Sequence, residues 1–124
     1  MEWKIELIFV PVTDVDRAKS FYVDQVGFHA DWDHTPTPGR RFVQLTPPGS
    51  ACSIAFGTGL GIEMEPGSLQ AIQVVVPDAD EARRHLLDHG VAASEVDEQA
   101  WGRFVTFKDP DGNGWMLQQL PKRD

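Results

Sequence analysis

The sequence has a single cysteine, Cys52, so no disulfide can form within the chain. Cys52 lies in the apolar stretch ACSIAF, where a lone thiol usually acts as a small buried side chain. No helix start or basic neighbour is evident that would activate this thiol as a nucleophile. We therefore expect a structural cysteine rather than a catalytic one.

Basic residues are also scarce, because 11 Lys and Arg stand against 19 Asp and Glu and give a formal charge of −8. A charge of this sign repels phosphate backbones and anionic lipid surfaces over about one Debye length. We therefore expect neither a nucleic-acid partner nor a membrane partner.

Long apolar runs are absent, since none approaches the roughly 20 residues that a membrane span needs. The N-terminal stretch MEWKIELIFVPV carries acidic residues where a signal peptide has a basic flank, so we expect a cytoplasmic protein. The hydrophobic content of 41% is nevertheless enough for the core of one ordinary domain. We expect a single domain over residues 1–124.

The first half of the chain predicts one strand, one helix and three further strands. Residues 3–12 are rich in β-branched and aromatic types, which is typical of a strand. Asp14 stands at the N-cap position of a helix over residues 14–26, which Gly27 closes. Three β-like segments follow, separated by the turn-forming stretches TPTPG and PPGS. They cover residues 28–32, 41–46 and 51–56.

The second half repeats this order after the Gly-rich stretch GTGLGIEMEPG, which has no periodicity. We assign residues 58–67 as a connector between two modules, at about 1–57 and 68–124. A strand at 69–76 precedes a helix that Asp78 or Asp80 caps and Gly90 ends. Strands at 91–96 and 103–108 follow, and the turn stretch DPDGNG leads into a last strand, WMLQQL.

Two stretches, VTDVDRAKSFYVDQVGF and FKDPDGNGWMLQQL, resemble the vicinal oxygen chelate superfamily of glyoxalases, bleomycin-resistance proteins and extradiol dioxygenases. With the repeat, the resemblance covers essentially the whole chain. It implies an α+β fold in which two tandem βαβββ modules form open-barrel, cleft-bearing sheets with the helices on the convex side. It also implies a homodimer, because open modules in this superfamily typically cover their edges by pairing within or between chains.

Members of the superfamily usually bind a divalent metal in the cleft through His and Glu. Carried over one position at a time, the ligand positions fall on Leu7, Ala71 and Met116, and near Ser53. These side chains offer a metal no useful donor beyond a soft thioether. We therefore expect neither a metal nor another cofactor, which argues against glyoxalase I, extradiol dioxygenase and fosfomycin-transferase chemistry.

Strand alternation adds further residues to the expected cleft. Gln73 and Gln118 should face the same concave surface as the ligand positions, where they either orient a ligand or hydrogen-bond each other. Trp32 and Trp101 lie in irregular segments and are candidate pocket walls, whereas Trp115 should pack under the helices. The expected cleft comprises Leu7, Phe9, Trp32, Ser53, Ala71, Gln73, Trp101, Met116 and Gln118.

Three functions remain open, and the sequence leaves undecided whether the protein is an enzyme. The first is metal-free binding of a small aromatic or amphipathic molecule, as in drug-resistance members of the superfamily. The second is a metal-independent isomerase, epimerase or cyclase with Glu63 or Glu95 as general base. The third is a divalent-metal lyase or dioxygenase whose metal ligands lie at positions other than those carried over above, for instance Glu6 and His29.

Four histidines bear on the third function. His29 and His34 lie in the stretch HADWDH, which either binds a metal adventitiously or is a charged strand and turn at the surface. His85 and His89 lie four residues apart on the second helix and are expected on its solvated face.

Overall fold

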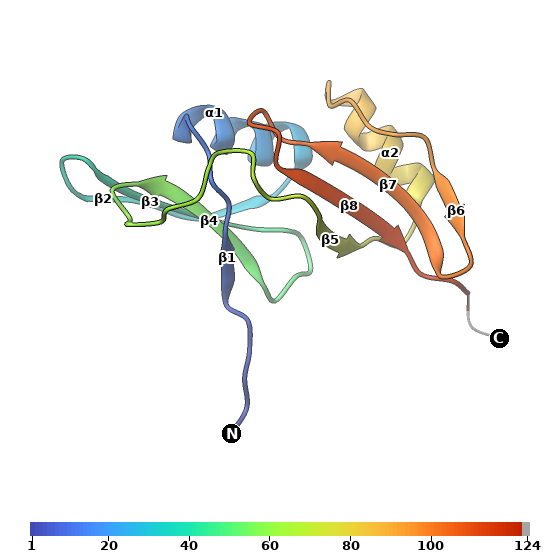
Figure 1. The fold of residues 1–124 in the computed structure, drawn as a ribbon. Coiled ribbons are helices and arrows are strands. Elements are labelled where there is room, and N and C mark those ends of the chain that lie inside the picture. Colours follow the sequence, from blue (N-terminus) through green and yellow to red (C-terminus); the bar gives the residue numbers. More distant parts are fainter. Residues whose placement is uncertain (123–124) are drawn as a thin grey trace.

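The N-terminal module is a four-stranded sheet with a helical segment over one face (Figure 1). The structure is a computed structural model that describes residues 1–122. The strand order is β1-β4-β3-β2, in which β1 runs parallel to β4 and the other pairs are antiparallel. Its elements are β1 (Leu7–Phe9), α1 (Val15–Ser20), the π-helix η1 (Phe21–Val26), β2 (His29–Thr37), β3 (Arg40–Thr46) and β4 (Ser53–Thr58).

The C-terminal module repeats this topology, with the strand order β5-β8-β7-β6 and a parallel β5·β8 pair. The predicted α+β class with two tandem βαβββ modules is confirmed, and neither sheet closes into a barrel. No helix within residues 1–122 has the length and apolar character that crossing a membrane requires. The elements are β5 (Ile72–Val75), α2 (Ala79–Asp88), β6 (Asp97–Gln99), β7 (Gly102–Lys108) and β8 (Gly114–Gln119).

Aspartate side chains cap both helices. The carboxylate of Asp14 accepts a hydrogen bond from the backbone N–H of Arg17 at 3.0 Å, as predicted. The carboxylate of Asp78 accepts from the N–H of Glu81 at 3.1 Å, so Asp78 is the cap of the second helix rather than Asp80. The first helix winds as an α-helix and then as a π-helix, and it ends at Gly27, whose φ of 103° requires glycine.

Three strand predictions and one turn prediction differ from the structure. The strands expected at 3–12 and 69–76 form ladders only over β1 and β5, which are edge strands with one neighbour each. The segment 91–96 makes only one bridge, from Ala93 to Phe107, and the strand β6 begins after it. The stretch TPTPG is not wholly a turn, because β2 continues to Thr37. An edge strand tolerates Pro36, since one side of it needs no backbone donor.

One aromatic core joins the two modules. Tyr22 and Phe28 of the N-terminal module lie with ring centroids 5.6 and 5.4 Å from Trp115 of β8. Trp115 is almost fully buried, which confirms that it packs under the helices. Figure 1 shows α1 and α2 on the same side of their sheets, so the opposite face of each sheet has no helix over it.

A buried polar network reinforces this core. The carboxylate of Asp109 accepts hydrogen bonds from Tyr22 Oη at 2.7 Å and from Asn113 Nδ2 at 2.8 Å. Asn113 Nδ2 also donates to the carbonyl of Pro11 at 2.8 Å, and Trp115 Nε1 donates to Tyr22 Oη at 2.9 Å. Burial raises the pKa of Tyr22, and the neighbouring Asp109 carboxylate raises it further. The network therefore ties the two modules together with the tyrosine as a neutral donor.

Candidate functional site

The backbone ladder shows which positions of the two modules are equivalent. In the first module, the N–H of Val10 donates to the carbonyl of Ala55 at 2.9 Å. In the second, the N–H of Val76 donates to the carbonyl of Gln118 at the same distance. Both bonds connect the end of a module's first strand to its last strand, so Val10 corresponds to Val76 and Ala55 to Gln118.

This equivalence corrects one position expected from the sequence. Leu7 pairs with Ser53 across β1 and β4, and Gln73 pairs with Met116 across β5 and β8. The structural counterpart of Leu7 is therefore Gln73, not Ala71. Ala71 is exposed and lies just before β5, two residues from Gln73.

The cause is a shorter connection in the second module. Three residues separate Val10 from the helix cap Asp14, whereas one residue separates Val76 from the cap Asp78. Counting back from the caps therefore shifts the expected position by two residues. The shift preserves strand parity, so Ala71 and Gln73 share one side of the chain.

The equivalent positions hold no set of metal donors of the superfamily type. They are Leu7, Ser53, Gln73 and Met116, and they offer one hydroxyl, one amide and one thioether. Divalent metals of this class prefer imidazole and carboxylate ligands. Within residues 1–122, no three His, Cys, Asp or Glu side chains come together in a way that could hold a metal ion. The residues present do not fit the usual metal.

The open face of the N-terminal sheet carries a chain of polar side chains, here called the polar chain: Asp31, Thr46, Ser53 and Gln44. Thr46 Oγ1 donates to the Asp31 carboxylate and lies 2.7 Å from Ser53 Oγ. Gln44 Nε2 donates to Ser53 Oγ at 3.2 Å. Ser53 is only 5% exposed, so its hydroxyl depends on these partners.

Trp32 stands beside the polar chain. It pairs with Gln44 across β2 and β3 and is 63% exposed. On the other side of the sheet, Val43 and Leu45 are completely buried in the core. The open face thus combines hydrogen-bonding groups with an accessible indole.

The open face of the C-terminal sheet contains an aromatic hollow of about 410 Å³, here called the C-terminal hollow. The rings of Trp101 and Phe104 lie 6.5 Å apart, and Trp101 is 62% exposed. Acidic side chains at one part of the wall give it an anionic edge. Its lining residues are Ser94, Glu95, Asp97, Gln99, Trp101, Phe104, Thr106 and Met116.

The two glutamines expected in the cleft hydrogen-bond each other. Gln73 Nε2 donates to Gln118 Oε1 at 2.7 Å, and Gln118 Nε2 donates to the carbonyl of Trp101 at 3.0 Å. This arrangement matches the alternative in which the amides satisfy one another. It also holds the backbone at Trp101 beside β8.

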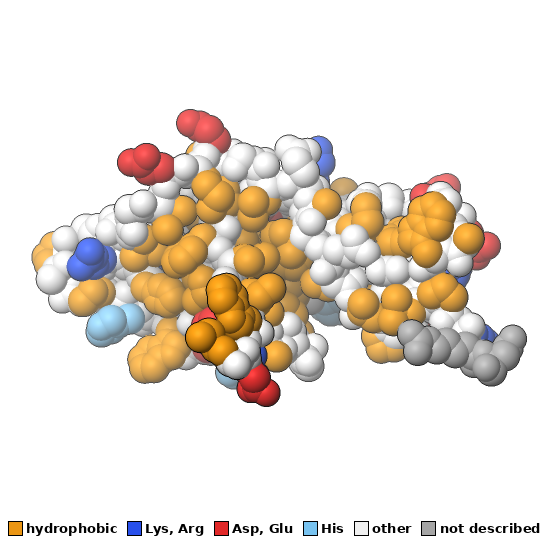
Figure 2. All heavy atoms as spheres, turned by 60° about the horizontal axis from the view of Figure 1, so that its bottom comes forward, with side chains coloured by type: hydrophobic (Ala, Val, Ile, Leu, Met, Phe, Trp, Pro, Cys, Tyr) orange, Lys and Arg blue, Asp and Glu red, His pale blue; other side chains and the backbone are white. Residues whose placement is uncertain are grey.

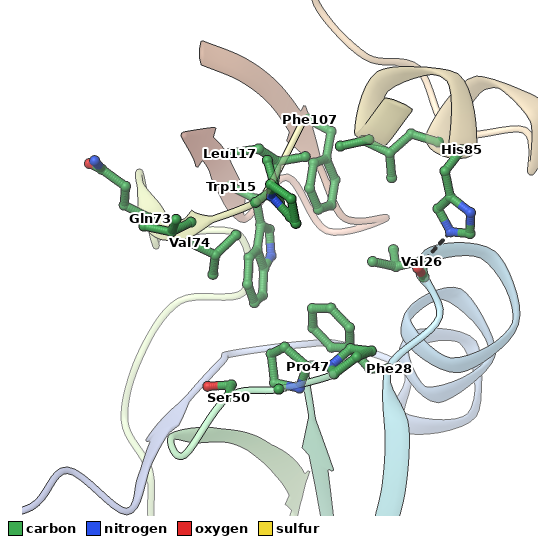
Figure 3. Close-up of a pocket in the computed structure, with 17 residues that line it drawn as sticks. Val26, Phe28, Pro47, Ser50, Gln73, Val74, His85, Phe107, Trp115 and Leu117 are labelled. Carbon is green, nitrogen blue, oxygen red and sulfur yellow. Dashed lines mark hydrogen bonds between the residues drawn. The ribbon is translucent and has the colours of Figure 1, made fainter. Parts of the chain in front are cut away.

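A larger pocket of about 570 Å³ lies between the modules, here called the seam pocket (Figure 3). Phe28 and Pro47 of the first module lie opposite Trp115 and Val74 of the second, while the side chain of Gln73 points away. His85 Nε2 lies 2.8 Å from the carbonyl oxygen of Val26 at one end. Sequence reasoning missed this pocket, because it arises only when two distant modules pack together.

The expected cleft residues do not gather into one hollow of a single chain. Trp101 and Met116 line the C-terminal hollow, whereas Leu7, Ser53 and Trp32 belong to the N-terminal sheet. Phe9 lines a separate hollow of about 190 Å³ beside the connector.

The two candidate general bases are likewise apart. Glu63 lines the small hollow that contains Phe9, and Glu95 lines the C-terminal hollow. The structure therefore does not pair these carboxylates with each other.

Apolar side chains are spread over much of the face that Figure 2 turns toward the viewer. Among the large apolar side chains, Trp32, Trp101 and Val75 are each more than 60% exposed. Strand register places Val75 beside Gln118, on the side of β5 away from the core.

Two tandem βαβββ modules, each with one sheet face that no helix covers, define the architectural class of this chain. The chain belongs to the Glyoxalase/Bleomycin resistance protein/Dioxygenase superfamily, whose family model matches residues 4–117.

Individual relatives support this assignment. The structure resembles TnmS3, an antibiotic binding protein from Streptomyces sp. CB03234, with 35% identity and a TM-score of 0.87 over 97% of this chain and 98% of TnmS3. A superfamily member from Sphaerobacter thermophilus DSM 20745 shows 31% identity and a TM-score of 0.83, covering 95% and 98% of the two chains. The uncharacterized protein YetH of Bacillus subtilis (strain 168) is 28% identical over 120 residues, which span 94% of this chain and 98% of YetH.

Proposed function

We propose that this protein binds a small aromatic or amphipathic molecule against its open sheet faces, without a metal ion. The observation that carries the proposal is the C-terminal hollow, in which Trp101 and Phe104 offer a wall for a flat ligand. The donor set at Leu7, Ser53 and Gln73 supports the metal-free part, because it lacks imidazole and carboxylate groups. TnmS3, at 35% identity, is an antibiotic binding protein, which supports the same class of function.

We further propose that a second copy of the chain completes the binding cleft. The two sheets lie side by side in Figure 1, so within one chain their open faces do not enclose a ligand. A two-fold pair would place the N-terminal face of one copy against the C-terminal face of the other and would cover Trp32 and Trp101. Light scattering at micromolar concentration should give the mass of a dimer, and a monomer mass would contradict this step. The expected compartment remains the cytoplasm, which suits a chain with one cysteine.

The proposed function is tested by calorimetry with 2-naphthol as the probe, before and after treatment with a chelator. We expect saturable binding that the chelator leaves unchanged. Metal analysis after gel filtration should find far less than one equivalent of zinc, nickel, manganese or iron. Binding that disappears with the chelator would overturn the metal-free proposal, and no binding at millimolar probe would overturn the ligand class.

The seam pocket is a second candidate location, because it is the larger hollow and lies within one chain. Two tryptophan substitutions at exposed positions distinguish the locations. Ala71→Trp adds bulk beside the open face of β5, and Ser50→Trp adds bulk at the rim of the seam pocket. We expect Ala71→Trp to weaken naphthol binding and Ser50→Trp to leave it intact, with both melting temperatures close to the parent. If Ser50→Trp weakened naphthol binding and Ala71→Trp did not, the ligand site would be the seam pocket.

A further inference from the structure

We infer that Gln44 is a hydrogen-bond acceptor that selects ligands bearing an aromatic hydroxyl or N–H group. The inference rests on the proposed binding function and adds the polar chemistry of the ligand. It follows from the polar chain of Asp31, Thr46, Ser53 and Gln44, whose hydrogens can be placed by counting donors.

The direction of the polar chain is fixed at its carboxylate end. A carboxylate only accepts hydrogen bonds, so the single hydroxyl hydrogen of Thr46 is used on Asp31. The contact of 2.7 Å between Thr46 Oγ1 and Ser53 Oγ then requires Ser53 to donate. Ser53 has no second hydrogen, so it must accept from Gln44. The Nε2 group of Gln44 therefore faces Ser53, and the amide cannot flip without losing a bond.

This orientation leaves Gln44 Oε1 available to a ligand. Within residues 1–122, Gln44 makes one side-chain hydrogen bond, through Nε2, and Oε1 has no partner. No buried side-chain nitrogen or oxygen among these residues lacks a hydrogen bond, so this unpaired oxygen is accessible from solvent. An oriented, accessible amide oxygen beside the exposed Trp32 ring suits a flat ligand with a donor at its edge.

The C-terminal sheet has no such acceptor at the equivalent position. Gln44 pairs with Ala55, and the counterpart pair in the second module is Phe104 with Gln118. Phe104 lines the C-terminal hollow and offers only an aromatic surface. The two faces therefore contribute different features to ligand recognition. The C-terminal face supplies an apolar wall, and the N-terminal face supplies an oriented hydrogen-bond acceptor.

The experiment compares 2-naphthol with 2-methoxynaphthalene, which keeps the rings and the oxygen but has no hydrogen to donate. The parent protein should prefer 2-naphthol by about 3- to 10-fold, the size of one net hydrogen bond. Gln44→Leu removes the acceptor, and the ratio should fall to about 1. Gln70→Leu is the control, because Gln70 is exposed before β5 and lines none of the hollows described above; this variant should keep the parental ratio. If Gln44→Leu also kept it, the preference would have another origin and the inference would be overturned.

Thr46→Val tests the polar chain, in which Thr46 acts as a positioning residue. Without the threonine hydroxyl, Ser53 can donate to Gln44 and the amide can turn over, so the ratio should fall below the parental value. A merely structural role would lower the affinity for both probes equally and leave the ratio unchanged, which would contradict the positioning step. If the parent binds both probes with equal affinity, the proposed binding function is retained, but the inference that Gln44 selects hydroxyl-bearing ligands is overturned. If it binds neither at millimolar concentration, the proposed function fails and the inference falls with it.

Discussion

The two modules share one ladder register but differ in the chemistry of their open faces. Equivalent positions hold Gln44 and Phe104 on the third strands, and Ser53 and Met116 on the last strands. The first module therefore presents a polar chain and the second an aromatic hollow. Core-facing residues preserve the backbone pairing, so the opposite side of each strand can differ without altering the fold.

The buried polar side chains of the two modules also have different structural roles. Asn113 of the second module is completely buried and contacts both the Asp109 carboxylate and the carbonyl of Pro11, which belongs to the first module. Ser53 of the first module is buried within its own sheet, and its hydroxyl bonds to Gln44 and Thr46 of the neighbouring strand β3. Asn113 therefore connects the two modules, whereas Ser53 takes part in the hydrogen bonds of one open face.

The largest effect expected from this contrast is on stability. Asn113→Ala removes bonds to Asp109, Pro11 and the N–H of Leu69 and should lower the free energy of unfolding by about 2–4 kcal/mol. Ser53→Ala should cost only about 1 kcal/mol, because Gln44 and Thr46 lie on the accessible face and regain water. Urea unfolding measures the free energy of unfolding of both variants. Equal losses in the two variants would contradict the proposal that Asn113 connects the modules whereas Ser53 acts only within its own sheet.

A smaller effect is expected on ligand affinity when the aromatic wall is removed. Trp101→Ala should weaken 2-naphthol binding by about 10-fold, through lost apolar contact and ring stacking. Trp32→Ala should also weaken it if a second copy brings the two faces together. Calorimetry at a concentration where the protein is a dimer provides the measurement. Full affinity in the Trp101 variant would place the ligand outside the C-terminal hollow.

The paired amides offer a sharper test of the same face. Replacing Gln73 and Gln118 together by leucine removes a bonded pair rather than one partner, so stability should change by less than about 1 kcal/mol. If both amides also bond the ligand, affinity should fall by about 1–3 kcal/mol. Unchanged affinity with an intact fold would show that these glutamines only brace the backbone at Trp101.

The smallest effect concerns surface ion pairs and pH. Hydrogen bonds from Arg41, and then from Lys19, lower the pKa of Asp33 below its ordinary value of 3.8. Because the folded pKa is the lower one, the stabilisation is present above about pH 4 and is lost as the pH falls through the folded value. Asp33→Asn should cost less than about 1 kcal/mol at neutral pH, and the difference from the parent should close under strong acid.

The matched change in the second module is Asp80→Asn. Its partner Arg103 lowers the pKa of Asp80 in the same direction, but the Asp80 side chain is more exposed than that of Asp33. Thermal unfolding between pH 2 and pH 7 should therefore show a weaker pH dependence of the Asp80 contribution than of the Asp33 contribution. A larger effect at Asp80 would show that solvent screening does not separate the two pairs.

The sequence predicted best what local chemistry decides. Asp14 was identified as a cap, and the second cap was narrowed to Asp78 or Asp80, because an N-cap needs only a short polar side chain and the next turn of helix. The strand near 91–96 was misplaced because a short edge strand is defined by its pairing with β7, which its own residues hardly specify. The counterpart of Leu7 was misplaced because a two-residue difference in connection length leaves no mark on hydrophobic parity.

The site was less predictable than the fold. Gln44 and Thr46 were not singled out, since a glutamine and a threonine in a strand carry no signal until Ser53 and Asp31 are brought beside them. Met116 was expected in the cleft from the superfamily resemblance and Trp101 from its place in an irregular segment, and both line the C-terminal hollow. What the sequence could not supply is the separation of the two faces within one chain.

The tyrosine at the centre of the core has a consequence for synthesis on the ribosome. Tyr22 leaves the exit tunnel early, but its partners Asp109 and Trp115 follow 87 and 93 residues later. The nascent first module thus carries an unsatisfied phenol and an incomplete core during most of translation, so its packing is completed only as the last strand emerges. Ribosomes stalled before Asp109 should hold a protease-sensitive chain, even though every strand of the first sheet has already been made.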